Sequence, residues 1–155
     1  MPTRIADSLY GIAIAVWVGG MLAIGYLAAP VLFAQLADRT LAGNLAGAMF
    51  RIMGWAGLGC GTYLLLYLVA RRGWRAARGG IFWIVAGMLA ITAASQFGIQ
   101  PLLAQLKSDA LPRQVMESAL RSRFATWHGI SSGLYLAQSV LGLWLILIQD
   151  RGRSR

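Results

Sequence analysis

The chain alternates between long apolar stretches and short polar connections. Four stretches are each long enough to cross a bilayer, Leu9–Leu36, Met49–Ala70, Ile81–Ala104 and His128–Ile148, since a helical crossing takes about 20 mostly apolar residues. None of them alternates apolar and polar residues as a membrane β-strand does, and only helices or closed barrels satisfy their backbone hydrogen bonds in lipid. The pattern predicts an all-α integral membrane four-helix bundle that forms a single domain.

The connection before the fourth stretch has a helical pattern of its own. Its apolar residues recur at helical spacing, and Arg113, Glu117 and Arg121 form a charged stripe at i, i+4 and i+8. Pro112 suits the first turn of a helix. We therefore expect an amphipathic helix over Pro112–Trp127, which either lies on the membrane surface or continues directly into the fourth span.

Small residues recur at a spacing of four on every span. Such rows let helix backbones approach closely, which matters in lipid because apolar side chains gain little by leaving lipid for each other. The rows are Gly11, Ala15, Gly19 and Ala23; Gly57 and Gly61, with Gly43 and Gly47 before them; Ala86, Ala90, Ala94 and Gly98; and Gly129, Gly133 and Ala137. They predict a compact bundle, and a row left over would serve a homo-oligomer or a partner subunit.

Composition excludes an ordinary soluble domain. Hydrophobic residues make up 58% of the 155 residues and charged residues only 12%, against about 45–50% and about 25% in soluble chains. The net charge of +9 is therefore not expected to bind nucleic acid, and we interpret the arginines as topology signals and contacts to the lipid bilayer. The single cysteine, Cys60, has no disulfide partner within the chain.

The charges also predict an orientation. With four spans, both termini and the connection between the second and third spans share one side of the membrane. That side carries eight arginines, Arg4, Arg71, Arg72, Arg75, Arg78, Arg151, Arg153 and Arg155. The other side carries six basic residues, several of them outside short flanking loops. The positive-inside rule favours cytoplasmic termini, in the inner membrane of a bacterium.

Polar residues within the spans are the candidates for function, because they are costly in lipid. Arg51, Gln96, Gln100 and His128 all fall in the outer leaflet and define a candidate ligand pocket. In the inner half only Asp7 and Ser8 stand near the span, so no equivalent set is expected there. Gln138 lies in the middle of the fourth span, where we expect it to hydrogen-bond to another helix.

His128 is the only histidine of the chain. It fits an interfacial residue bonded to a backbone carbonyl, and it also fits a functional group of the outer pocket. As a metal ligand it would need partners such as Met49 or Met53, and thioethers can bind Cu(I), but these are weak candidates. We therefore predict no cofactor and no metal site.

The residue sets of common enzymes are missing. There is no carboxylate pair at membrane depth, no Ser/His/Asp set and no Cys/His cluster, which weighs against an enzyme and leaves the question open. The leading hypothesis is a structural or accessory membrane subunit, in a homo-oligomer or a larger membrane complex. The alternative is a binder or transporter of a small molecule, lipid or ion at the His128 pocket. The third is a copper- or heme-binding redox protein.

Several motifs occur in a recognisable order. Trp17–Gly20 precedes Ala29–Phe33, then Phe50 and Arg51 open the second span, and Phe124–Gly129 leads into the fourth. In this order the chain resembles a family of small four-helix membrane proteins described as a domain of unknown function. Its eukaryotic relatives include a transmembrane protein associated with cisplatin resistance.

The resemblance implies a four-helix fold but no agreed activity. It marks as family-pattern positions Trp17, Gly19, Gly20, Pro30, Phe33, Gly43, Arg51 and His128. The Trp-x-Gly-Gly segment is also similar to the copper-resistance membrane protein CopD and to HemJ-type protoporphyrinogen oxidases. Those proteins carry histidines in additional helices that this chain lacks, which argues against metal or tetrapyrrole chemistry here.

Overall fold

The protein folds into four long helices. The computed structural model describes residues 2–110 and 118–149, with side chains over 4–106 and 122–149. The elements are α1 (Pro2–Ile14), a π-helical turn (Ala15–Gly19), α2 (Gly20–Ala23), a π-helical turn (Ile24–Ala28), α3 (Ala29–Gln35), α4 (Arg39–Arg72), a 3₁₀ turn (Gly73–Arg78), α5 (Gly80–Ala94), a π-helical turn (Ser95–Ile99), α6 (Gln100–Ala110) and α7 (Ser118–Gln149). Four helices are long and apolar enough to cross a membrane, and the described residues form no strand. The predicted all-α membrane bundle is confirmed.

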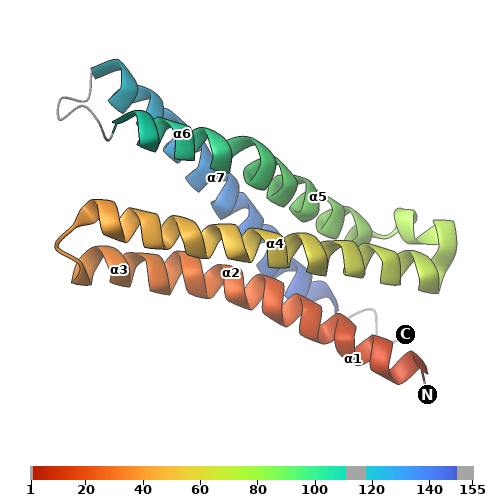
Figure 1. The fold of residues 1–155 in the computed structure, drawn as a ribbon. Coiled ribbons are helices and arrows are strands. Elements are labelled where there is room, and N and C mark those ends of the chain that lie inside the picture. Colours follow the sequence, from red (N-terminus) through yellow and green to blue (C-terminus); the bar gives the residue numbers. More distant parts are fainter. Residues whose placement is uncertain (1, 111–117, 150–155) are drawn as a thin grey trace.

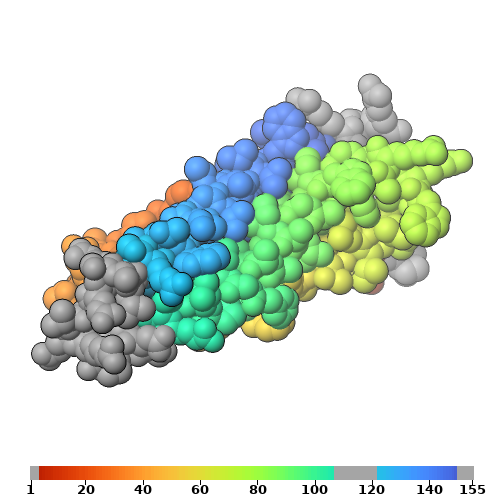
Figure 2. Space-filling model, turned by 90° about the horizontal axis from the view of Figure 1, so that it is seen from above, coloured from red at the N-terminus to blue at the C-terminus, as the bar shows by residue number. Residues whose placement is uncertain are grey.

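Each helix runs antiparallel to the one before it (Figure 1). The first helix, made of α1, α2 and α3, lies beside α4, and the third, made of α5 and α6, lies on the other side of α4. α7 packs against α5 and α6 (Figure 2) and returns to the first helix. The start of α1, the 3₁₀ turn and the end of α7 share one end of the bundle, named here the basal end. The opposite end is the distal end.

The α4 helix extends well beyond its apolar stretch. It begins at Arg39 because the Asp38 carboxylate accepts hydrogen bonds from the backbone N–H groups of Thr40 (2.8 Å) and Leu41 (3.2 Å), as an N-cap does. It ends at Gly73, whose φ of +56° lies in the left-handed region that favours glycine. The sequence pattern located the span but not this polar first part of the helix.

Two prolines follow widened turns within the long helices. Proline lacks an N–H group, and its ring clashes with the carbonyl four residues earlier in a regular α-helix. The π-helical turn Ile24–Ala28 ends two residues before Pro30, and the turn Ser95–Ile99 ends two residues before Pro101. The N–H groups of Ala29 and Gln100 reach back to the carbonyls of Ile24 and Ser95. These i→i−5 bonds let both helices continue past the proline.

The core lies nearer the basal end and joins all four helices. Its buried members are Ala13, Ile14, Trp17, Val18, Leu64, Val85, Met88 and Leu145. Trp17 is the largest fully buried side chain, at 1% exposure. The four helices therefore meet in one core, and the largest side chain in it is Trp17 of the first helix.

α7 begins before its apolar stretch and runs without a break from Ser118 to Gln149. The part over Ser118–Trp127 is thus continuous with the fourth span, one of the two arrangements expected for this segment. The beginning of the expected amphipathic helix, residues 112–117, lies outside the described residues.

Candidate functional site

Gln96 and Arg51, two members of the predicted outer pocket, meet at the distal half of the bundle. Gln96 is 9% exposed, and its Nε2 donates to the Arg51 backbone carbonyl at 3.3 Å. The Gln96 side-chain amide lies against the backbone of α4 at Gly54, where an added Cβ would be 2.2 Å from the Gln96 Oε1. Gln96 therefore joins the third helix to α4 through the backbone, without using the Arg51 guanidinium.

The other predicted pocket members point to more open positions. Arg51 and His128 are exposed, and Gln100 is half-buried. The His128 ring stacks on Phe124, with ring centroids 5.9 Å apart and planes 7° from parallel, while its carbonyl accepts from Ser132 at 2.9 Å. Among the described side chains, no hydrogen bond joins the His128 ring to Arg51, Gln96 or Gln100. A ligand pocket at these four residues stays a prediction.

Gln138 and Thr92 form a buried polar pair at mid-span. Gln138 Nε2 donates to Thr92 Oγ1 at 2.7 Å, and that hydroxyl donates to the Met88 carbonyl at 2.9 Å. The two side chains are 7% and 5% exposed. The expected interhelical bond of Gln138 is confirmed, and it joins α7 to α5.

Two tyrosines and a serine join α7 to the first helix, and the hydropathy pattern gives no sign of these contacts. The Tyr135 hydroxyl donates to the Met21 carbonyl, and Tyr26 donates to Ser139 Oγ at 3.1 Å. A Cβ at Gly25 would lie within 2.5 Å of the Tyr135 hydroxyl oxygen, so the absence of a side chain there makes room for it. Tyrosine in an apolar span was counted as apolar, although its hydroxyl needs a partner when buried.

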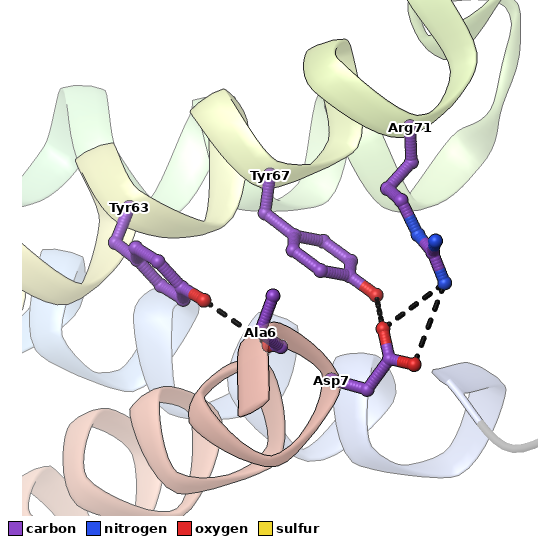
Figure 3. Close-up of polar contacts among 5 residues, drawn as sticks. All are labelled: Ala6, Asp7, Tyr63, Tyr67 and Arg71. Carbon is purple, nitrogen blue, oxygen red and sulfur yellow. Dashed lines mark hydrogen bonds and ion pairs between the residues drawn. The ribbon is translucent and has the colours of Figure 1, made fainter. Parts of the chain in front are cut away.

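The basal end carries a second polar cluster, made of Asp7, Tyr63, Tyr67 and Arg71 (Figure 3). The Asp7 carboxylate accepts from the Tyr67 hydroxyl and from Arg71 at 3.1 and 3.4 Å. Tyr63 donates to the Ala6 carbonyl at 3.1 Å, and the Arg71 guanidinium lies 5.7 Å from the Tyr67 ring centre.

The expectation that this half of the membrane holds no polar set was wrong. The partners of Asp7 come from α4, more than fifty positions along the chain. The spacing of four between Tyr63, Tyr67 and Arg71 places them on one helix face, and that was the available signal. Among the described residues this is also where the one ion pair lies.

Two of the family-pattern positions pack inside the bundle. Added Cβ atoms at Gly57 and Gly61 would lie 2.5 and 2.8 Å from the Trp17 indole, so Trp17 lies directly on the backbone of α4. At Gly20 a Cβ would lie 2.8 Å from the Met53 sulfur. These contacts make Trp17 and Gly20 packing positions between the first helix and α4.

The remaining family-pattern positions lie nearer the surface. Gly19 is exposed and has open space where a Cβ would stand. Pro30 and Phe33 are exposed, and Gly43 is half-buried. None of these contacts by itself defines a chemical site.

The rows of small residues divide into one that faces inward and three that face outward. Gly57 and Gly61 on α4 are buried beneath Trp17, whereas Ala15, Gly19 and Ala23 on the first helix are exposed. The same holds on the third and fourth helices for Ala90, Ala94, Gly98, Gly129, Gly133 and Ala137. A Cβ added at Gly11, Gly19, Gly98, Gly129 or Gly133 would meet nothing within 4 Å. Apart from Gly11 and Ala86, which are half-buried, the residues of these three rows are therefore exposed on the surface of the bundle.

Two apolar hollows lie away from the predicted pocket. One, of about 160 Å³, is lined by Val69, Gly73, Trp74, Ala77 and Phe82 at the basal end. The other, of about 260 Å³, is a shallow groove between the first helix and α4, beside Cys60. In the part of the chain that the structure describes, no three His, Cys, Asp or Glu side chains gather as a metal site would need.

Comparison with protein families gives a match over most of the chain. The family described as "Domain of unknown function (DUF4149)" matches residues 12–112. The chain therefore belongs to the DUF4149 family. Searches of curated proteins and of solved structures found no match. The matched segment contains most of the first span and all of the second and third, with Trp17, the glycines against which Trp17 packs, and Gln96.

Proposed function

We propose that the protein is a structural or accessory subunit that assembles with further transmembrane helices, either as a homo-oligomer or in a larger membrane complex. The observation that supports this proposal is the set of exposed small-residue rows on the first, third and fourth helices. Small side chains facing lipid give no packing within the chain, whereas they allow a second helix to come close.

The polar groups inside the bundle agree with such a role. Gln96, Gln138, Tyr26 and Tyr135 each use a polar atom to join two helices of this chain. Their hydrogen bonds hold the bundle together and leave no set of inward polar groups aimed at a reacting molecule among the described residues. A rigid bundle with a small-residue surface suits a subunit that packs against others.

We also propose where the protein is located and to which other families it is related. The arginine-rich basal end supports cytoplasmic termini in a bacterial inner membrane. Relationship to the eukaryotic transmembrane protein associated with cisplatin resistance, and to CopD and HemJ-type proteins, is proposed on the shared motifs alone.

The test is the mass and composition of the protein extracted gently into nanodiscs. We expect a particle larger than one chain, or defined companion subunits. The double substitution Ala15→Leu/Gly19→Leu fills the outward row of the first helix and is expected to shift the particle towards the single chain. Ile12→Leu/Val16→Leu, on exposed large residues of the same helix, is the matched control and should leave the mass unchanged.

Two results would overturn the proposal. One is a strictly monomeric particle without companions, in which the row substitutions change nothing. The other is a monomer that carries a stoichiometric chromophore, metal or small molecule. That second result would transfer the function to the His128 pocket or to a redox centre.

A further inference from the structure

The connection between α4 and α5 forms an apolar hollow at the basal end. The chain turns at Gly73 and passes through the 3₁₀ turn Gly73–Arg78 before α5 begins. The hollow of about 160 Å³ lies beneath this turn, and its walls are apolar side chains and Gly73. In Figure 2 this connection, coloured yellow-green, projects at the end of the bundle.

Three arginines, the last residue of α4 and two residues of the 3₁₀ turn, make no polar contact within the described structure. Arg72, Arg75 and Arg78 are exposed, and none of them has a hydrogen bond or ion pair within the described chain. The neighbouring Arg71 is bound to Asp7 at 3.1 Å, and Asp7 is the one acid that the structure describes at this end. Within the described residues these three arginines have no counter-charge, and each is the chain neighbour of a residue that lines the hollow, namely Gly73, Trp74 or Ala77.

Two tryptophans place this region at the membrane surface. Trp74, in the wall of the hollow, is 95% exposed. Trp83 is 65% exposed, and its indole nitrogen donates to the Ala77 carbonyl at 2.8 Å. Tryptophan with one polar and one apolar side concentrates at the headgroup level of a bilayer. The hollow therefore opens where lipid headgroups meet the start of their chains.

We propose that this basal hollow is a binding site for an anionic phospholipid of the adjacent leaflet. Arg72, Arg75 and Arg78 would hold the phosphate, because guanidinium groups bind phosphate oxygens in pairs. The apolar walls at Val69, Trp74 and Phe82 would receive the first part of an acyl chain. Basic pockets at helix ends on one membrane side are known to hold anionic headgroups in this way.

A lipid explains both halves of the site, whereas a free anion explains only one. Inorganic phosphate would use the arginines and leave the hollow and the exposed Trp74 without a partner. A neutral phospholipid would use the hollow and leave the arginines without a net counter-charge. The combination of cations, apolar walls and interfacial depth requires a molecule that is both acidic and apolar.

The test counts lipids bound to the full-length protein. The protein in detergent is titrated with phosphatidylglycerol, with phosphatidylcholine and with inorganic phosphate, and bound molecules are counted by native mass spectrometry. Tryptophan fluorescence follows the same titrations. We expect one saturable phosphatidylglycerol molecule per chain, and binding at least tenfold weaker for phosphatidylcholine.

Two variants separate the parts of the site. Arg72→Gln/Arg75→Gln/Arg78→Gln is expected to weaken phosphatidylglycerol binding by at least about tenfold, because one surface arginine contributes roughly fivefold near anionic lipid. Ala77→Phe fills the hollow, keeps every charge and is expected to weaken binding as well. The control Arg39→Gln/Arg123→Gln removes two exposed arginines that lie outside both the basal end and the candidate outer pocket, and it should bind like the unchanged protein.

The proposal is overturned by any of three outcomes. The first is binding that never saturates, and the second is equal loss in the basal triple variant and the control, which would reveal only general attraction to acidic lipid. The third is competition by inorganic phosphate at equal concentration together with unchanged binding by Ala77→Phe, which would reveal an anion site. Each outcome is independent of whether the protein forms an oligomer.

Discussion

Glycines at the same spacing have opposite surroundings on α4 and on α7. Gly57 and Gly61 are buried, and the Trp17 indole lies where their side chains would be. Gly129 and Gly133 are exposed and have open space at the same position. A small-residue row in a membrane helix therefore indicates that another helix comes close, but it does not say whether that helix belongs to the same chain. On α4 the approaching helix belongs to the same chain, and on α7 the structure leaves the place open.

The largest loss of stability is expected when the Trp17 side chain, which packs against the glycine row of α4, is removed. Trp17→Ala should lower the free energy of unfolding by about 3 kcal/mol, at the low end of the range for a buried tryptophan. The low end is expected because the unfolded helices stay in lipid, so mainly packing is lost. Equilibrium unfolding by sodium dodecyl sulfate in mixed micelles, followed by circular dichroism, measures it. Trp144→Ala, on an exposed tryptophan, is the control and should change little.

The second largest loss of stability is expected when a large side chain is introduced into the inward row on α4. Gly57→Leu should cost about 1–3 kcal/mol, because even a Cβ would lie 2.5 Å from the Trp17 Nε1 and overpacking forces side chains off their rotamers. Gly133→Leu on α7 should stay within about 0.5 kcal/mol in a monomeric preparation. Equal costs for the two substitutions would contradict the division into inward and outward rows.

A double variant tests whether Trp17 and a side chain at position 57 occupy the same space. Trp17→Ala/Gly57→Leu lets the leucine occupy part of the space left by the indole. Its cost should therefore be smaller than the sum of the two single costs by about 0.5–3 kcal/mol, the range for residues in contact. Strict additivity in the same unfolding titration would mean that the two residues do not share the space.

The polar pair between α5 and α7 should contribute less than the packing around Trp17. Gln138→Leu is expected to cost about 0.6 kcal/mol, the average for interhelical hydrogen bonds in lipid, and at most about 1.7 kcal/mol. Thr92→Val/Gln138→Leu removes both partners and should cost about as much as the single change, because the Thr92 hydroxyl still donates to the Met88 carbonyl when Gln138 is lost. A larger loss in the double variant would point to a role beyond this bond.

An effect similar to or smaller than that of Gln138→Leu is expected at the basal ion pair. Asp7→Asn keeps the shape and removes the charge that Arg71 meets at 3.1 Å. Because the side chains are 33% and 47% exposed, the loss should be within about 1 kcal/mol. Raising the salt concentration should reduce the difference from the unchanged protein by screening. A loss that is insensitive to salt would assign the effect to the short-range hydrogen bond from the Tyr67 hydroxyl to Asp7 and not to the ion pair.

Much of the fold could be predicted because the lipid environment restricts the choices. The length of the apolar stretches and the lack of alternation require helices, and four of them follow from counting. Gln138 could be predicted to bond across helices because a mid-span amide must find a partner. The extension of α4 from Arg39 was missed, since it depends on the Asp38 cap and not on hydrophobicity.

The candidate site was harder to predict, because its residues meet across helices. Gln96 and Arg51 fall in the same leaflet by counting residues, but the counting could not tell that Gln96 bonds the Arg51 carbonyl. Asp7 looked isolated until Tyr67 and Arg71 were brought to it from α4. The position of a polar residue in the sequence indicates its depth in the membrane. Whether it forms a hydrogen bond with another helix also depends on how both helices are rotated about their axes.

The sequence by itself determined the all-α membrane class of the protein, the number of long apolar helices, and that the first of them begins at the end of the bundle where the fourth one ends. These depend on transfer of side chains to lipid and on backbone hydrogen bonding, and both are set residue by residue. Only the tertiary structure decided which small-residue rows are filled, that Trp17 packs onto Gly57 and Gly61, and that an apolar hollow forms at the connection between α4 and α5. Those features depend on how the helices are rotated about their axes, and that rotation follows from the packing of all four helices together.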